Sequence, residues 1–195
     1  MYAAPPTSSL SSQQLRLATR GFTTIELMVV IAIITILAAL AAPSFRPLIE
    51  RWRVRAATED LQSILYYARS EAIKRGGKIV LKKIASGNGC TAADANTQWG
   101  CGWTVFIDAN NNATQDSGEL TLQTSSAPTK LEINLASSNG YITVDRWGQL
   151  ASAGSSSFNF RLFPQGSNAT NSAAATLCVA AGGMIRRLNT GDGTC

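Results

Sequence analysis

The pattern of apolar and polar residues divides the chain into four consecutive stretches. Residues 1–21 are polar and end in basic residues, and residues 22–42 form an apolar run with one carboxylate and a few threonines. Residues 43–77 place apolar side chains at helical spacing, and residues 78–195 break into short runs typical of strands. The sequence therefore predicts a leader, an apolar helix, its amphipathic continuation and a β-rich domain.

The apolar run has the length of a membrane-spanning helix. At 1.5 Å per residue, a helix over residues 22–42 would cross the ~30 Å of hydrocarbon in a bilayer. Arg16 and Arg20 precede it and would hold the leader on the cytoplasmic side. Glu26 lies inside the run, and a carboxylate at membrane depth costs roughly 2.5 kcal/mol or more, so its presence asks for a functional reason.

The helical pattern continues beyond the apolar run. Pro43 predicts a kink, because proline lacks a backbone N–H and crowds the preceding turn. Apolar residues then recur at helical spacing over residues 48–73 and leave one face for a sheet. Gly76 and Gly77 predict the end of this helix.

Short β-like runs with turn residues between them follow the helix. Seven such runs are residues 78–84, 103–108, 119–123, 131–135, 141–144, 158–163 and 176–179, and an eighth strand is expected over residues 184–188. A long N-terminal helix packed on an antiparallel β-sheet is an α+β fold.

The composition of the chain excludes several classes of function and says less about the fold. The net charge is +5, and removing Arg16 and Arg20 with the leader leaves +3, a mildly basic balance that does not by itself imply nucleic acid. The chain has no histidine, which excludes His-based triads and most transition-metal sites. Its serines and aspartates lie in no nucleophile motif. We therefore expect no enzyme and no cofactor.

Four cysteines in the β-rich part suggest disulfides, if this part is exported. Proximity in the sequence favours Cys90 with Cys101 and Cys178 with Cys195, although three pairings exist. A zinc site is the weaker alternative, because no two cysteines are closely spaced and histidine is absent.

The segment 108–119 follows the spacing of a calcium loop. Five of its residues fall at loop positions one, three, five, nine and twelve. Ala113 stands where the sharp turn of such a loop requires glycine, and the flanks are predicted strands, not helices. We interpret the segment as a polar hairpin tip, with calcium as the less favoured alternative. The five residues are Asp108, Asn110, Asn112, Asp116 and Glu119.

The boundary between leader and apolar run reads GFTTIELMVV over residues 21–30. This stretch resembles the N-terminal signature of type IV pilins and type II secretion pseudopilins. The resemblance implies cleavage between Gly21 and Phe22 by a membrane prepilin peptidase, followed by N-methylation of Phe22. It also implies that Glu26 pairs with the N-terminal amine of a neighbouring subunit. Such a pair is physically reasonable, because a charge in a low-dielectric helix bundle needs an opposite partner.

Three later segments, residues 102–108, 141–150 and 182–188, resemble the GspH/FimT branch of these proteins. The resemblance implies a pilin-like α+β fold for the whole chain. It also implies a minor pilin or pseudopilin that primes or caps assembly of a type IV pilus or a type II secretion pseudopilus. The sequence leaves open which of the two machines the subunit serves.

Some FimT proteins bind DNA through a C-terminal Gly-Arg-x-Arg. The aligned residues here are Gly183, Met184, Ile185 and Arg186, so the first arginine of that motif is missing. Arg187 would point to the opposite face of a strand from Arg186. Because of these departures from the motif, we keep a DNA-binding minor pilin for natural transformation as the alternative function and not as the main one. Its weak, salt-sensitive contacts would come from Arg186, Arg187, Lys82 and Lys83.

The expected location follows from the resemblance. The chain would cross the inner membrane once, through residues 22–42, with the sheet domain in the periplasm, and would then join a pilus or pseudopilus. The expected partners are the prepilin peptidase, the membrane and other pilins or pseudopilins through the N-terminal helix. DNA is a partner only in the alternative function.

Overall fold

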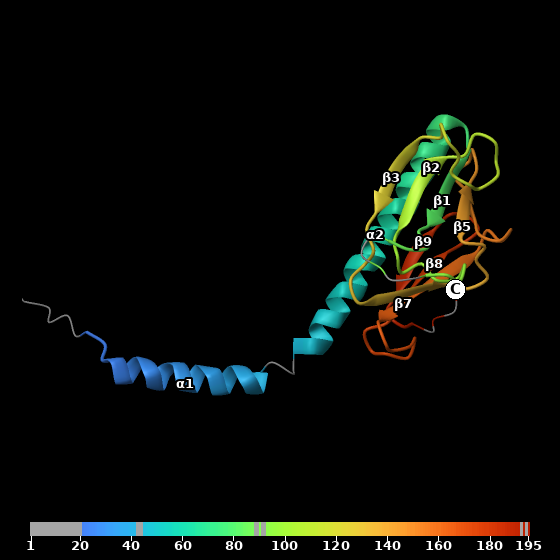
Figure 1. The fold of residues 1–195 in the computed structure, drawn as a ribbon. Coiled ribbons are helices and arrows are strands. Elements are labelled where there is room, and N and C mark those ends of the chain that lie inside the picture. The colour runs from blue at the N-terminus through green and yellow to red at the C-terminus, as the bar shows by residue number, and fades with distance from the viewer. Residues whose placement is uncertain (1–20, 42–44, 88–89, 91–92, 192, 194) are drawn as a thin grey trace, which may run out of the picture. The chain divides into compact units, whose positions relative to one another are not determined.

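The structure is a computed structural model that describes residues 21–41, 45–87, 90, 93–191, 193 and 195. The chain divides into two compact units, residues 1–43 and 44–195 (Figure 1). The described part of the first unit contains helix α1 (Thr24–Ala41), and that of the second begins with helix α2 (Arg46–Arg75). The predicted leader and the kink at Pro43 lie outside the described residues.

Helix α1 begins at the predicted apolar run. Thr23 caps it, since its Oγ1 accepts a hydrogen bond from the N–H of Glu26 at 3.2 Å. Within the described ranges, no helix is long and apolar enough to cross a membrane. Helix α1 begins two residues after the start that was expected at residue 22. The 18 residues of α1 measure about 27 Å, against ~30 Å of hydrocarbon.

Helix α2 is amphipathic, as its sequence predicted. It ends where the glycine pair was expected to stop it. Gly76 adopts a left-handed conformation with φ 77°, and the N–H of Gly77 bonds to the carbonyl of Ala72 at 2.7 Å. The buried apolar residues recur every three or four positions and are Val54, Ala57, Leu61, Ile64, Leu65, Ala68 and Ala72.

The strands of the second unit form two antiparallel sheets. In the first sheet the spatial order is β3 (Thr121–Ser125), β2 (Trp103–Ile107), β1 (Ile79–Lys83), β5 (Tyr141–Val144) and β6 (Leu150–Ala151). In the second sheet it is β4 (Leu131–Leu135), β7 (Phe158–Pro164), β8 (Ala175–Val179) and β9 (Ile185–Leu188).

Helix α2 contacts both sheets, through β1 and β5 of the first and β7 and β8 of the second (Figure 1). The sequence predicted one sheet. The 30 residues of α2 extend over about 45 Å, whereas five-residue strands are about 17 Å long and five of them span ~20 Å. One such sheet would leave much of the helix uncovered. The core between helix and sheets includes Leu61, Leu65, Trp103 and Phe160.

The eight predicted strands are confirmed, with ends that differ by at most two residues. Strand β3 begins at Thr121 instead of residue 119, because the carboxylate of Glu119 is used in the preceding loop. It accepts hydrogen bonds from the N–H groups of Ala109 and Asp116. Strand β6 was not predicted. It has two residues, and only its pairing with β5 identifies it.

Candidate assembly site

The predicted processing and assembly residues lie at the start of the described chain, just before and within the first turn of α1. Gly21 and Phe22 precede α1, and Phe22 is 80% exposed. Glu26 lies in the first turn, where the interaction of a negative charge with the helix dipole stabilises the helix by roughly 0.3–1 kcal/mol. Thr23 and Glu26 also have the spacing of a capping box, which gives this pair a local role at the start of the helix.

The carboxylate of Glu26 is exposed in an apolar helix. Among the described residues, the ion pairs are Arg55–Glu59, Lys74–Glu71 and Arg75–Glu71, and none of them includes Glu26.

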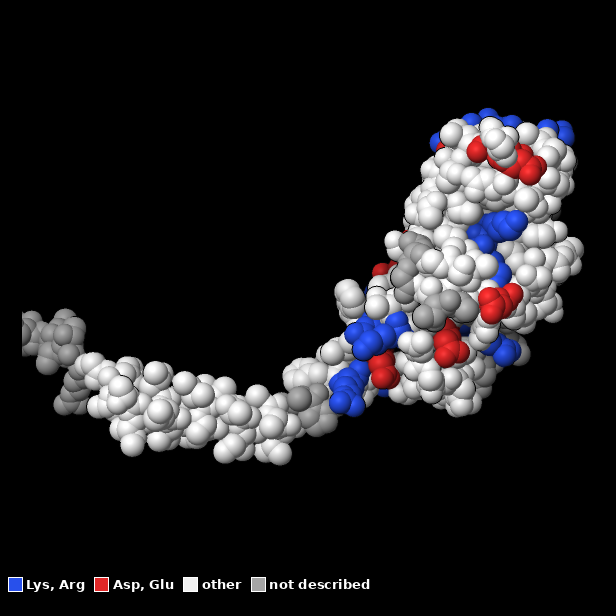
Figure 2. Space-filling view, in the orientation of Figure 1, with Lys and Arg blue, Asp and Glu red and all other residues white. Residues whose placement is uncertain are grey.

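The rest of α1 is apolar on every side. A helix with this pattern is normally buried in protein or in a membrane, because water contacts are unfavourable for all of its faces. On the face drawn in Figure 2, α1 carries no blue atoms, whereas blue atoms gather over the first turns of α2. The exposed large apolar residues of this segment are Phe22, Ile25, Leu27, Met28, Val29, Val30, Ile31, Ile33, Ile34, Ile36, Leu37 and Leu40.

The cysteines pair as their proximity in the sequence favoured. Cys90 bonds to Cys101 with Cα atoms 5.1 Å apart, and Cys178 bonds to Cys195 with Cα atoms 5.6 Å apart. The described residues contain no free cysteine. The second bond ties the last residue of the chain to β8.

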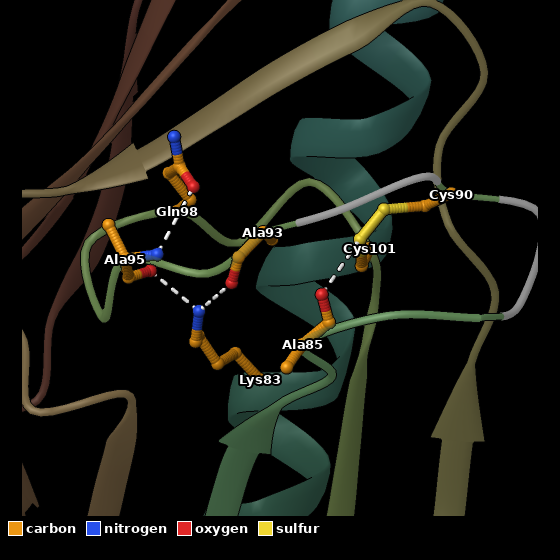
Figure 3. Close-up of a disulfide and its surroundings, with 7 residues drawn as sticks. All are labelled: Lys83, Ala85, Cys90, Ala93, Ala95, Gln98 and Cys101. Carbon is orange, nitrogen blue, oxygen red and sulfur yellow. Dashed lines mark hydrogen bonds between the residues drawn. A yellow bond between two sulfur atoms is a disulfide. The ribbon is translucent and has the colours of Figure 1, made fainter.

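Lys83 stabilises the segment that carries the first disulfide. Its buried Nζ donates to the carbonyls of Ala93 and, at 2.6 Å, Ala95 (Figure 3). Burial lowers the pKa of this ammonium group below its ordinary value, since the charged form loses its water. The ammonium group of Lys83, which was predicted as a candidate DNA contact, is therefore held against these two carbonyls.

The other candidate DNA contacts are also dispersed. Arg187 lies opposite Leu177, on the core-facing side of its sheet, and the exposed Arg186 lies opposite Cys178. The prediction that these two arginines occupy opposite faces is confirmed. Lys82 belongs to the other sheet and donates to the carbonyl of Ala113 at 3.0 Å. The four cations do not form one patch.

The segment 108–119 closes on itself through hydrogen bonds. The two carboxylate oxygens of Asp108 accept from the N–H groups of Asn112 and Ala113. The amides of Asn110 and Asn112 donate to the carboxylate of Asp116 at 2.8 and 2.7 Å, and these bonds lower its pKa from the ordinary value.

This closed arrangement is that of a polar turn. Carboxylate oxygens that a calcium ion would need are hydrogen-bonded within the segment, namely both oxygens of Asp108, both of Glu119 and Oδ2 of Asp116. Within the part of the chain that the structure describes, no group of three His, Cys, Asp or Glu residues could hold a metal ion. Ala113 has φ 55°, so alanine here adopts the conformation for which a calcium loop uses glycine.

Comparison with known proteins identifies the family. The model of the family described as "Type II transport protein GspH" matches residues 57–183, which is more than half of the chain. The chain belongs to the GspH family. A second family model, the prokaryotic N-terminal methylation motif, matches residues 16–42, the region of the leader and α1. This GspH-family protein is therefore a minor pilin or pseudopilin, as its motifs predicted.

Individual relatives agree with the family. A fimbrial protein of Pseudomonas aeruginosa is 39% identical over 87 residues, which are 45% of this chain and 50% of that protein. The pilin-like protein PilA1 of Thermus thermophilus is 32% identical over 100 residues, 51% of this chain and 55% of that protein. The chain thus spans about half the length of these curated relatives.

A solved structure supports the fold. The crystal structure of the type IV minor pilin FimU of Pseudomonas aeruginosa has a TM-score of 0.50 and 20% identity, and the match covers 70% of this chain and 88% of that one. At this identity the likeness concerns the fold alone. It agrees with the predicted pilin-like α+β architecture.

Proposed function

We propose that this GspH-family subunit joins a type IV pilus or a type II secretion pseudopilus through α1 and primes or caps its assembly. The observation that carries the proposal is the helix itself. It is apolar on all sides, it is exposed, and it holds one acid in its first turn. Equivalent helices of other subunits can pack against every face of such a helix and keep it out of water, which favours association.

Glu26 would set the register of that association. Cleavage after Gly21 would create an α-amine at Phe22, four residues before Glu26 in the sequence. An apolar helix bundle strongly disfavours an unpaired carboxylate and an unpaired amine. Two neighbouring subunits satisfy both charges only when the amine of one lies beside Glu26 of the other, so alternative registers are selected against.

Before assembly, residues 22–42 would hold the subunit at the inner membrane, with the sheet domain outside the cytoplasm. Support comes from the match to the N-terminal methylation motif and from the two disulfides, which persist in oxidising compartments. We do not propose DNA capture. The structure supports it less than assembly, because Lys83 is buried and the other three cations are dispersed.

The test is the substitution Glu26→Ala in the full chain, expressed in a strain that lacks the native subunit. We expect the variant to reach the membrane fraction as well as the wild type, since it loses a charge from an apolar helix. Its recovery in sheared filaments should fall about tenfold or more, because a buried amine without its carboxylate costs several kcal/mol.

Glu59→Ala is the matched control, since Glu59 is an exposed acid in the other helix. It should assemble normally. Normal recovery of Glu26→Ala in filaments would refute the role of this residue, and loss of both variants from the membrane fraction would refute the proposed anchoring. Performing the same complementation in a pilus mutant and in a secretion mutant identifies the machine that the subunit serves.

A further inference from the structure

The first two turns of α2 carry an apolar stripe that the rest of the unit leaves uncovered. Phe45, Leu48, Ile49 and Trp52 follow the spacing i, i+3, i+4 and i+7, which places them on one side of the helix. All four are exposed, and Trp52 most of all, at 71%. We call these four residues the α2 stripe.

The α2 stripe faces away from the sheets. At 100° per residue, the buried Val54 lies roughly 180° around the helix from Phe45, and the buried Leu61 lies roughly 160° from it. The core therefore takes the opposite side of α2. The packing of this unit therefore leaves the stripe uncovered.

Arginines flank the stripe on both sides. On the same helical wheel Arg46 and Arg53 fall roughly 80–100° to one side, and Arg51 and Arg55 fall roughly 80–120° to the other. Arg55 pairs with Glu59 and Arg51 lies 3.5 Å from the hydroxyl of Ser172. The segment from residue 46 to residue 55 contains these four arginines and the single acid Glu50.

The character of this side of α2 reverses one or two turns later. Glu59 and Asp60 fall roughly 30–70° from the centre of the stripe, where the apolar residues would continue. The apolar, cationic zone is thus confined to residues 45–55, or about 15 Å of helix. A partner that attracts arginines and repels carboxylates fits this distribution.

We infer that the α2 stripe lies in the headgroup layer of an anionic membrane, with the flanking arginines on lipid phosphates. The inference rests on the proposed function, because α1 ends at Ala41, four positions before Phe45 in the sequence. Aromatic rings and arginine are the side chains that favour the boundary between headgroups and acyl chains. Juxtamembrane basic segments bind anionic lipid by charge.

A second copy of this chain is a poorer occupant. A symmetric contact through the stripe would bring two sets of arginines together, and like charges across an interface disfavour association. A membrane surface containing phosphatidylglycerol instead neutralises every arginine. Its headgroup layer also accepts the indole of Trp52, which has an apolar body and one polar N–H.

The experiment uses the full chain reconstituted in vesicles of phosphatidylcholine, with or without phosphatidylglycerol. Trp52 and Trp147 are matched probes, since they are 71% and 72% exposed, whereas Trp99 and Trp103 are buried. Comparing the wild type with Trp52→Phe and with Trp147→Phe isolates the fluorescence of each indole. The readouts are quenching by aqueous acrylamide and by brominated lipid.

With anionic lipid we expect Trp52 to lose most of its acrylamide quenching and to gain quenching by brominated lipid, while Trp147 stays open to acrylamide. The protection of Trp52 should weaken in high salt and in the double variant Arg46→Gln/Arg53→Gln, because it depends on charge. Equal acrylamide quenching of Trp52 and Trp147 in both lipids would overturn the inference.

Protection of Trp52 that is the same in neutral and in anionic vesicles would also overturn it, and would assign the stripe to a neighbouring subunit instead. Flotation separates this test from the proposed function. A chain that floats with the vesicles but leaves Trp52 open contradicts only the inference. A chain that does not float contradicts the proposed anchoring.

Discussion

The two helices of this chain differ in whether the second unit covers their apolar side chains. Helix α2 has one apolar side, and two sheets of the same unit cover most of it. Helix α1 is apolar on all sides, and its large apolar side chains are exposed. The free energy gained by burying apolar surface is thus realised inside the second unit, whereas the apolar surface of α1 is available for the association proposed above.

Because of this difference, substitutions in the two helices should affect different properties, namely stability and assembly. A substitution in the buried side of α2 should act on the folding of the sheet-bearing unit, and one in α1 should act on what the subunit joins. The start of α2 lies between these cases, because it belongs to the second unit, yet its first buried residue is Val54 and its first turns carry the exposed stripe.

The largest expected effect comes from truncating the core. Leu61→Ala removes a fully buried side chain between α2 and the sheets and should lower the free energy of unfolding by about 2–5 kcal/mol. Leu37→Ala removes the same atoms from an exposed position of α1 and should change it by less than about 0.5 kcal/mol. Urea unfolding followed by tryptophan fluorescence measures both. Equal effects would contradict the division between the helices.

The two disulfides belong to the second unit, so removing one tests the difference between this unit and α1. Replacing Cys178 and Cys195 by alanine opens a loop with a sequence separation of 17 and should lower the free energy of unfolding by about 3 kcal/mol in the chain-entropy account. Filament recovery under non-denaturing conditions should change far less, since α1 is untouched. A midpoint in urea identical to that of the oxidised wild type would contradict this expectation.

Much of the second unit could be predicted because its signals are local. The end of α2 follows from two consecutive glycines, and the strands from short apolar runs between turn residues. The disulfides follow from proximity along the chain. The motif at Gly21, Phe22 and Glu26 is likewise local, and the match to the N-terminal methylation motif covers it. The roles of these three residues remain predictions.

What escaped prediction depends on contacts between distant segments. Lys83 reads as one of several surface cations until the carbonyls of Ala93 and Ala95 enclose its ammonium group. Strand β6 exists through its pairing with β5 and has no pattern of its own. The division of the strands into two sheets depends on the length of α2. The relation between this length and the strands shows only in the assembled core.

The smallest expected effect concerns charge. The largely buried carboxylate of Glu71 accepts hydrogen bonds from Lys74 and Arg75, both at 2.9 Å, and these bonds lower its pKa from the ordinary value. A carboxylate whose pKa is lower in the folded state stabilises the fold above its unfolded pKa. That contribution is lost as the pH falls through the folded pKa.

Glu71→Gln should therefore be less stable than the wild type near neutral pH, and the two unfolding curves should converge as the pH falls below roughly 4.3. Glu26→Gln is the counterpart in α1, outside the sheet-bearing unit, so it should leave the unfolding transition of that unit unchanged. Urea titrations from pH ~7 to ~3 compare the three proteins. A constant gap between Glu71→Gln and the wild type over this range would show that Glu71 acts through packing and not through its charge.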